Sequence, residues 1–210
     1  MTERDKLTEE RIFEAAKTVF SERGMDGARM QEIADKAGIN KSLLHYYFRS
    51  KEKLFNAVFD DIAGMTFMKF AQIFAYPLPL EEKIRYFFSE HIEFMKLNPG
   101  LPIFILTEIN RNPARMQNLI KKIDYSSILE IFTRDMEREN SGSSNPLTIK
   151  PGDLAQIVTT AVAMSVFPFA AKNLLEPALQ QAGIPFDQYI EERKDFAANF
   201  IINYLKSPKS

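Results

Sequence analysis

The sequence predicts an all-α protein, and two observations support this fold class. Hydrophobic residues recur at the i, i+3, i+4 spacing of an amphipathic helix along most of the 210 residues, and no strand-like alternation persists. Hydrophobic residues make up 45% of the chain and charged residues 26%, which is enough apolar material for a real core. We expect about nine helices in two domains: residues 1–50, with three helices, and residues 51–210.

The expected helices are separated by Pro, Gly and Asn. Thr8 can cap the first helix, and Gly24 can end it. A long helix introduced by Asn112-Pro113 should lead to a polar loop at Asn140–Pro146, which is rich in Ser and Asn. The other expected ranges are 30–37, 41–48, 51–75, 80–97, 101–110, 152–176 and 187–206.

Charge and composition exclude several classes of protein. The net charge is −1, so any anion-binding surface must be local. The chain has no cysteine, which excludes disulfides and thiolate sites. The first ten residues carry charges of both signs, unlike a signal peptide. Residues 154–171 are uncharged, which is near the lower limit for a membrane span, but their polar residues and helical spacing favour a helix buried among others. We expect no membrane association.

The stretch MQEIADKAGINKSLLHYYFRSKEKLF, residues 30–55, predicts two short helices that cross at a steep angle. Ala34 is small enough for the second helix to pass close over it. Gly38 can adopt the left-handed backbone conformation that the turn requires. Four apolar residues are expected to fill the wedge between the two helices: Ile33, Ile39, Leu44 and Phe48.

The second of these short helices should present a mixed polar and aromatic face to the outside. Residues 36–53 contain five basic residues and one acidic residue, a local net charge of +4. A basic patch beside a short exposed helix indicates a phosphate-backbone partner. The alternative is that Tyr46 and Tyr47 are half-buried packing residues and that the charges form a solvated face.

At these residues the sequence resembles the TetR family of bacterial transcriptional regulators. The resemblance covers about 45 residues, including RIFEAAKTVFSERG in the first helix and IADKAGINKSLLHYYFRSKEKLF after it. It implies a helix-turn-helix at about 30–49 that binds double-stranded DNA. Two departures stand out: His45 occupies the position of a common Tyr, and Arg29 that of a common Ser or Thr cap.

The resemblance also implies roles for individual residues. Lys41, Ser42, Leu43 and Tyr46 should face base edges or the groove floor. His45, Tyr47 and Lys51 should reach backbone phosphates. The complete set of expected DNA-binding residues is Arg29, Gln31, Asn40, Lys41, Ser42, Leu43, His45, Tyr46, Tyr47 and Lys51.

The remaining helices are expected to bind a ligand and to form a homodimer. The resemblance implies that the last two helices pack against their symmetry mates in a four-helix bundle, and their apolar stripes agree with this. The alternative is that both helices only cap the core of a monomer. The expected interface residues are Leu154, Val158, Ala161, Val162, Phe196, Phe200 and Tyr204.

A ligand pocket is expected among the central helices, with apolar walls and a few polar groups. The alternative is that these residues belong to an ordinary core. The expected lining residues are Phe88, His91, Ile92, Phe104, Thr107, Glu108, Tyr125, Met164 and Phe167.

These observations together predict a cytoplasmic, homodimeric repressor that a small, mainly apolar effector releases from a palindromic operator. No nucleotide loop, metalloprotease spacing or nucleophile motif is present in the sequence. We therefore expect no catalytic residue, metal or cofactor. The alternative function is an all-α small-molecule-binding protein or enzyme that has a central cavity and no operator.

Overall fold

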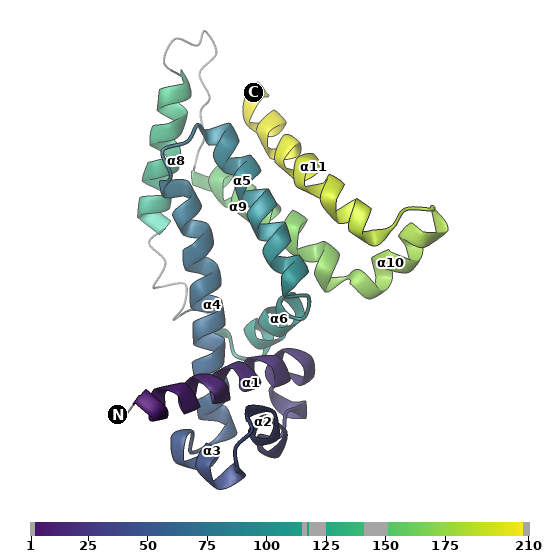
Figure 1. The fold of residues 1–210 in the computed structure, drawn as a ribbon. Coiled ribbons are helices and arrows are strands. Elements are labelled where there is room, and N and C mark those ends of the chain that lie inside the picture. Colours follow the sequence, from purple (N-terminus) through teal and green to yellow (C-terminus); the bar gives the residue numbers. More distant parts are fainter. Residues whose placement is uncertain (1–2, 115–116, 118–124, 141–150, 208–210) are drawn as a thin grey trace. The chain divides into compact units, whose positions relative to one another are not determined.

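The computed structural model describes residues 3–114, 117, 125–140 and 151–207, and the regular elements in these residues are all helices (Figure 1). The predicted all-α fold is therefore confirmed. The described part of the chain contains ten helices: α1 (Glu3–Gly27), α2 (Met30–Ala37), α3 (Lys41–Tyr47), α4 (Lys51–Ala75), α5 (Leu80–Leu97), α6 (Leu101–Arg111), α8 (Tyr125–Asn140), α9 (Pro151–Ala170), α10 (Lys172–Gln181) and α11 (Phe186–Lys206).

The first helix is longer than the sequence predicted at both ends. It begins at Glu3, so Thr8 lies inside the helix and does not cap it. Glu3 and Asp5 occupy the first turn, where negative charge interacts favourably with the helix dipole. Gly24 interrupts the helix without ending it: its φ of 64° and ψ of 179° produce a kink, and the helix continues to Gly27.

The expected helix at 152–176 is two helices in the structure. Ala171, with a φ of −104° and a ψ of 20°, separates α9 from α10. Pro168, three residues earlier, is the only local signal of this break. The expected count of nine helices is low for this reason, and α9 and α11 are consequently not consecutive helices. Asn140, where the sequence predicted a loop to begin, is the last residue of α8. Residues 141–146 of that loop and most of residues 112–124 lie outside the described residues.

The chain forms two compact units. The first contains Met1–Thr66 and Ile103–Ile120, and the second contains Phe67–Pro102 and Lys121–Ser210. The first part of α4 and most of α6 therefore belong with α1–α3. The expected functional boundary at residue 50 remains a prediction.

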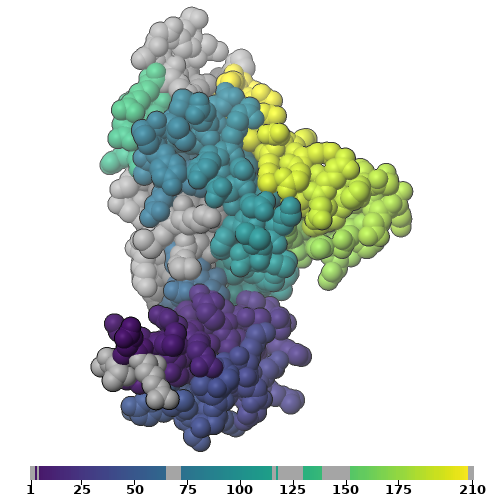
Figure 2. Space-filling model, in the orientation of Figure 1, coloured from purple at the N-terminus to yellow at the C-terminus, as the bar shows by residue number. Residues whose placement is uncertain are grey.

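The core of the first unit is aromatic. Phe55 on α4 packs edge-on against Phe20 of α1, with ring centroids 4.9 Å apart, and against Phe104 of α6 at 5.5 Å. Ile12, Val19 and Phe20 of α1 are fully buried. In the space-filling view the atoms of α1, α2 and α3, from purple to blue, pack closely together (Figure 2).

The second unit is built around α5, which packs against α9 and α11 and also contacts α8. Its core contains a buried ion pair between Lys83 of α5 and Asp135 of α8. The ammonium group of Lys83 also donates to the carbonyl oxygen of Phe74, in the last turn of α4, at 2.8 Å. One lysine thus joins three helices. The sequence analysis did not identify this pair, because its partners are 52 residues apart.

Helix α9 is the one described helix that is long and apolar enough to cross a membrane, over Gly152–Ala170. Only 22% of that segment is buried within the protomer. It packs through Ile157, Ser165 and Phe169, which are buried, against α5 and α11. The expectation that this segment is buried among other helices is therefore wrong for the protomer: α9 packs on one side and leaves most of its surface uncovered.

The buried ion pair leads to a prediction about stability. Lys83→Met should lower the free energy of unfolding by about 3–5 kcal/mol, because it leaves the carboxylate of Asp135 buried without its partner. Urea denaturation followed by circular dichroism measures this change. The double variant Lys83→Met/Asp135→Leu should recover most of the loss, since no charge then remains buried. A single variant within 1 kcal/mol of the parent protein would show that the pair is solvated.

Candidate nucleic-acid interface

The turn between α2 and α3 depends on Gly38. Its φ of 66° and ψ of 35° place it in the left-handed region, which confirms the prediction for this residue. The N–H of Ile39 donates to the carbonyl of Ala34 at 3.0 Å, and the N–H of Gly38 donates to the carbonyl of Asp35 at 3.1 Å. Two of the carbonyl groups in the last turn of α2 therefore accept hydrogen bonds from the turn. A Cβ atom at Gly38 would lie 2.6 Å from Nη2 of Arg11. The backbone conformation therefore favours glycine at this position, and a side chain there would also displace the guanidinium group of Arg11.

Arg11 of α1 stabilises the same turn through hydrogen bonds to its backbone carbonyls. Its Nη2 donates to the carbonyl of Ala37 at 2.5 Å and lies 3.5 Å from that of Gly38. A guanidinium group at the C-terminus of a helix also interacts favourably with the helix dipole. Sequence reasoning missed Arg11, because nothing in its local pattern indicates a partner 26 residues away.

Two contacts fix how α3 is oriented. The side chain of Asn40 caps the helix by accepting a hydrogen bond from the N–H of Leu43 at 2.8 Å. Leu44 is fully buried and is the only buried residue of α3. Ile33 and Ala34 of α2 are fully buried as well, whereas Ile39 and Phe48 are only half-buried.

The structure places most of the expected DNA-binding residues on the outer surface of the first unit. Tyr46 has 78% of its surface exposed and Leu43 has 36%. Arg29 precedes α2 in an extended conformation and makes no side-chain capping bond. Gln31 donates to Asp35 at 2.8 Å. The exposed members of the expected set are Arg29, Gln31, Asn40, Lys41, Ser42, Leu43, His45 and Tyr46.

Tyr47 is half-buried, and its hydroxyl group has a partner within the protein. It donates to the carboxylate of Asp5 on α1 at 3.1 Å. Partial burial, together with the hydrogen bond and charge of Asp5, raises the pKa of Tyr47. Its ring also packs edge-on against the ring of Tyr46, with centroids 5.4 Å apart. Tyr47 thus connects α1 to the exposed surface of α3.

Lys51, at the start of α4, also has partners within the protein. Its Nζ donates to the carbonyl of Ala28 at 3.2 Å and lies 3.4 Å from that of Asp26. The carboxylate of Asp26 in turn forms a bidentate ion pair with Arg111 of α6, with both N–O distances at 2.7 Å. The guanidinium of Arg111 lowers the pKa of this carboxyl group. Lys51 and Arg111 therefore both stabilise the connection between α1 and α2, Lys51 through backbone carbonyls and Arg111 through the side chain of Asp26.

The expected dimer residues lie on α9 and α11, two helices that pack together, and most of them are exposed. Arg193 of α11 joins them by donating to the carbonyl of Met164 at 2.9 Å. Val162 remains 42% exposed and Phe196 60% exposed, although both are apolar. Val158, Phe200 and Tyr204 are exposed too, whereas Leu154 and Ala161 are half-buried.

The residues expected to line a pocket fall in both units. In the second unit, Phe88 and Ile92 are fully buried, and His91 Nδ1 lies 2.8 Å from the hydroxyl oxygen of Ser165, which is also buried. Met164 is half-buried and Phe167 is exposed.

In the first unit, Phe104 packs against Phe55 and Phe59, Glu108 is buried and Thr107 is exposed. The side chain of Tyr125 lies outside the described residues. The role of this set in binding a ligand remains a prediction.

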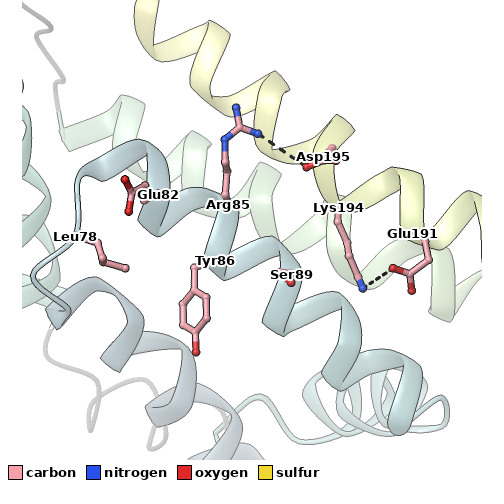
Figure 3. Close-up of a pocket in the computed structure, with 8 residues that line it drawn as sticks. All are labelled: Leu78, Glu82, Arg85, Tyr86, Ser89, Glu191, Lys194 and Asp195. Atoms are coloured by element: carbon pink, nitrogen blue, oxygen red, sulfur yellow. Dashed lines mark hydrogen bonds and ion pairs between the residues drawn. The ribbon is translucent and has the colours of Figure 1, made fainter.

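A groove of about 490 Å³ lies on the second unit between α5 and α11 (Figure 3). Its charges are largely balanced: Arg85 lies 3.9 Å from Asp195, and Lys194 lies 2.7 Å from Glu191. None of the expected pocket residues lines this groove. The lining residues are Leu78, Glu82, Arg85, Tyr86, Ser89, Glu191, Lys194 and Asp195.

Comparison with known proteins identifies the region that carries the exposed helix. Residues 12–58 match the model of a family described as bacterial regulatory proteins, tetR family. The HTH-type transcriptional repressor NicS of Pseudomonas putida is 44% identical over 55 residues, which are 26% of this chain and 26% of NicS. The HTH-type transcriptional regulator RutR of Escherichia coli is 47% identical over 51 residues, 24% of each chain. These matches span about a quarter of the relatives' own length.

Solved structures resemble the fold over nearly the whole chain. A TetR-like transcriptional regulator from Rhodococcus sp. RHA1 has a TM-score of 0.64 at 20% identity, covering 96% of this chain and 97% of its own. A TetR transcription regulator from Haloarcula marismortui has a TM-score of 0.63 at 16% identity, with the same coverage. The matched family and these relatives are described as regulators. The turn at Gly38 and the match over residues 12–58 agree, so this region is similar to the bacterial regulatory proteins of the tetR family, and the fold of the chain resembles those of the solved regulators.

Proposed function

We propose that this protein is a cytoplasmic repressor that binds a palindromic DNA operator as a homodimer and is released by a small, mainly apolar effector. The observation that carries the proposal is the exposed surface of α3, held outward by the burial of Leu44 and the turn at Gly38. Selection of bound duplexes from a random DNA pool tests it directly. A palindromic motif should emerge, whereas a pool without enrichment would contradict the proposal.

The second helix of a helix-turn-helix reads DNA by entering the major groove. The exposed residues Lys41, Ser42, Leu43 and Tyr46 on α3 have the positions for this role. His45, Arg29 and Gln31 are exposed and can reach the sugar–phosphate backbone. The net charge of +4 over residues 36–53 supplies the attraction that such a surface needs on a protein of net charge −1.

Lys51 and Tyr47 fit a more limited role in binding phosphate. The ammonium group of Lys51 carries three N–H donors, and the carbonyls of Asp26 and Ala28 lie within reach of two of them. Its charge and its remaining donor are available to a phosphate. The hydroxyl of Tyr47, in contrast, has one proton and already donates it to Asp5. A phosphate contact at Tyr47 requires an exchange of partners.

Assembly through α9 and α11 is supported by the apolar surface that both helices leave uncovered. Val158 and Val162 of α9, with Phe196 and Phe200 of α11, expose large apolar side chains on neighbouring helices. A two-fold pairing of this surface gives a four-helix bundle and buries it. Two copies of α3 then read two half-sites, which is why we expect a palindromic operator.

Release by an effector is supported by the course of α4, which contributes residues to both units. A ligand bound among the central helices that displaced α4 would change the separation of the two α3 helices in the dimer. Both could then no longer enter their major grooves, so ligand and operator would oppose each other's binding. The apolar residues Phe88 and Ile92 beside the His91–Ser165 pair favour a mainly apolar effector with one or two polar groups.

The phosphate role of Lys51 can be measured by salt dependence. Lys51→Ala should weaken binding to operator and to random DNA alike, and should reduce the slope of log K against log salt by about one. Fluorescence anisotropy at several salt concentrations gives the slope. Lys96→Ala is the matched control, because Lys96 is a partly exposed lysine of the second unit that pairs with Glu191. An unchanged slope for Lys51→Ala would remove Lys51 from the interface.

The interface can be tested by placing a charge on the shared apolar surface. Val162→Asp should convert the dimer to a monomer that remains folded, because Val162 is partly exposed in the protomer and would be buried without a counter-charge in the dimer. Light scattering reports the mass, and thermal melting reports the fold. Leu97→Asp is the control, since Leu97 is an exposed leucine at the end of α5. A Val162→Asp protein that stays dimeric would place the interface elsewhere.

The effector can be sought with a thermal-shift screen that ranges from lipophilic and aromatic compounds to phosphorylated metabolites. An apolar effector should raise the melting temperature by mass action and should also release the operator. If only polyanions raise the melting temperature, the effector class is wrong. If an apolar compound binds without changing operator affinity, the release mechanism is wrong.

A further inference from the structure

Two apolar side chains lie on the outer surface of α3, within the basic patch. Leu43 is 36% exposed and Tyr46 is 78% exposed, and they are three residues apart, which places them on the same side of the helix. Single exposed apolar residues are common on protein surfaces. A pair of them on a seven-residue helix with one buried residue gives this helix an apolar strip, flanked by Lys41, Ser42 and His45.

The amide side chains near this strip are already committed within the protein. Reading adenine in the major groove needs an Asn or Gln that offers its carbonyl oxygen and its NH₂ group together. The carbonyl oxygen of Asn40 accepts the capping hydrogen bond from Leu43 at 2.8 Å. The NH₂ group of Gln31 donates to Asp35 at 2.8 Å. Neither amide is free to make the two-bond contact to adenine without losing a bond that shapes the surface.

The side chain of Tyr46 packs against that of Tyr47 within the protein. The ring of Tyr47 meets it edge-on at 5.4 Å and 90°, and the hydroxyl of Tyr47 is held by Asp5 at 3.1 Å. An aromatic side chain fixed in this way loses little conformational freedom when it makes a contact. The strip is therefore an apolar surface whose largest side chain is already ordered before it makes a contact.

We propose that Leu43 and Tyr46 recognise the C5-methyl groups of thymines in each operator half-site, so that a substantial part of sequence selection is apolar. The inference rests on the proposed function and deepens it. The thymine methyl is the apolar group that a base pair presents in the major groove, whereas the other groups there are hydrogen-bond donors and acceptors. The positive charge around the strip fits the phosphates on either side of such a site.

The experiment removes the methyl group without changing base pairing. After the operator has been selected, each thymine is replaced in turn by deoxyuridine, and the dissociation constant is measured by fluorescence anisotropy at fixed salt. Removal of one contacted methyl should weaken binding about fourfold, from the transfer free energy of one such group. Removal at both symmetric half-sites should weaken it roughly tenfold or more. Thymines outside the contacted positions should show no effect.

A double-mutant cycle assigns the contact to its residue. Leu43→Ala should weaken binding to the thymine operator, and its binding should then be insensitive to deoxyuridine at one position of each half-site. Tyr46→Ala should remove the sensitivity at a different position. Leu106→Ala is the matched control, because Leu106 is an exposed leucine of α6 in the same unit, and it should retain the full thymine preference.

The outcomes separate this inference from the proposed function. A tight, selected operator that is insensitive to deoxyuridine overturns the thymine inference and leaves the repressor proposal standing. If no operator is selected, the proposed function itself fails. Equal deoxyuridine sensitivity in Leu43→Ala, Tyr46→Ala and the parent protein would mean that other residues read the methyl groups. Loss of dimer mass in Leu43→Ala would identify the strip as a protein contact, which also overturns the inference.

Discussion

The left-handed backbone at Gly38 is the constraint on which the exposed surface of α3 depends. A residue with a side chain would be strained at a φ of 66°, and its Cβ atom would also displace the guanidinium group of Arg11. Arg11 in turn accounts for a carbonyl at the end of α2 that the turn leaves without a helical partner. With the turn fixed, Leu44 is directed into the core, and the opposite side of α3 must face outward. The exposure of the DNA-binding candidates is thus a consequence of one backbone conformation.

The second unit is subject to a different constraint: its helices leave apolar side chains of α9 and α11 exposed to water. Helix α5 supplies the internal partner for α9 and α11, and Lys83, Asp135 and the carbonyl of Phe74 tie α4, α5 and α8 together. On α9 and α11 the apolar side chains of Val158, Val162, Phe196 and Phe200 are exposed in the protomer. Exposed apolar area of this kind is unfavourable in water, and association with a second copy removes it. The proposed dimer would account for the long uncharged run of α9.

The sequence was informative wherever a local pattern determines the structure. The all-α fold, the left-handed glycine, the burial of Leu44 and the exposure of α3 all follow from helical spacing and turn chemistry over a few residues. The contacts made by Arg11, by Tyr47 with Asp5, and by Lys51 with Ala28 could not be predicted, because their partners are 23 to 42 residues away and leave no periodic trace. The break at Ala171 was missed because alanine is a good helix former. The residues expected to line a ligand pocket were the hardest to predict, since Phe and Met at helical spacing are typical of an ordinary core as well as of a cavity wall.

The internal partners of Tyr47 and Lys51 affect how the protein would divide its affinity between charge and shape. A phosphate that approaches Tyr47 must displace the carboxylate of Asp5, which is itself negatively charged and lies 3.1 Å from the hydroxyl. Part of the favourable phosphate contact is therefore offset by the bond that is lost and by repulsion from Asp5. Lys51 has less to give up, because its carbonyl partners are neutral and it retains a donor. An interface with weakened phosphate contacts at one edge depends more on its base contacts, and on α3 the largest exposed side chain that can make them is Tyr46. Apolar contacts carry no salt dependence of their own, so selectivity gained from them would persist at salt concentrations where nonspecific binding is lost.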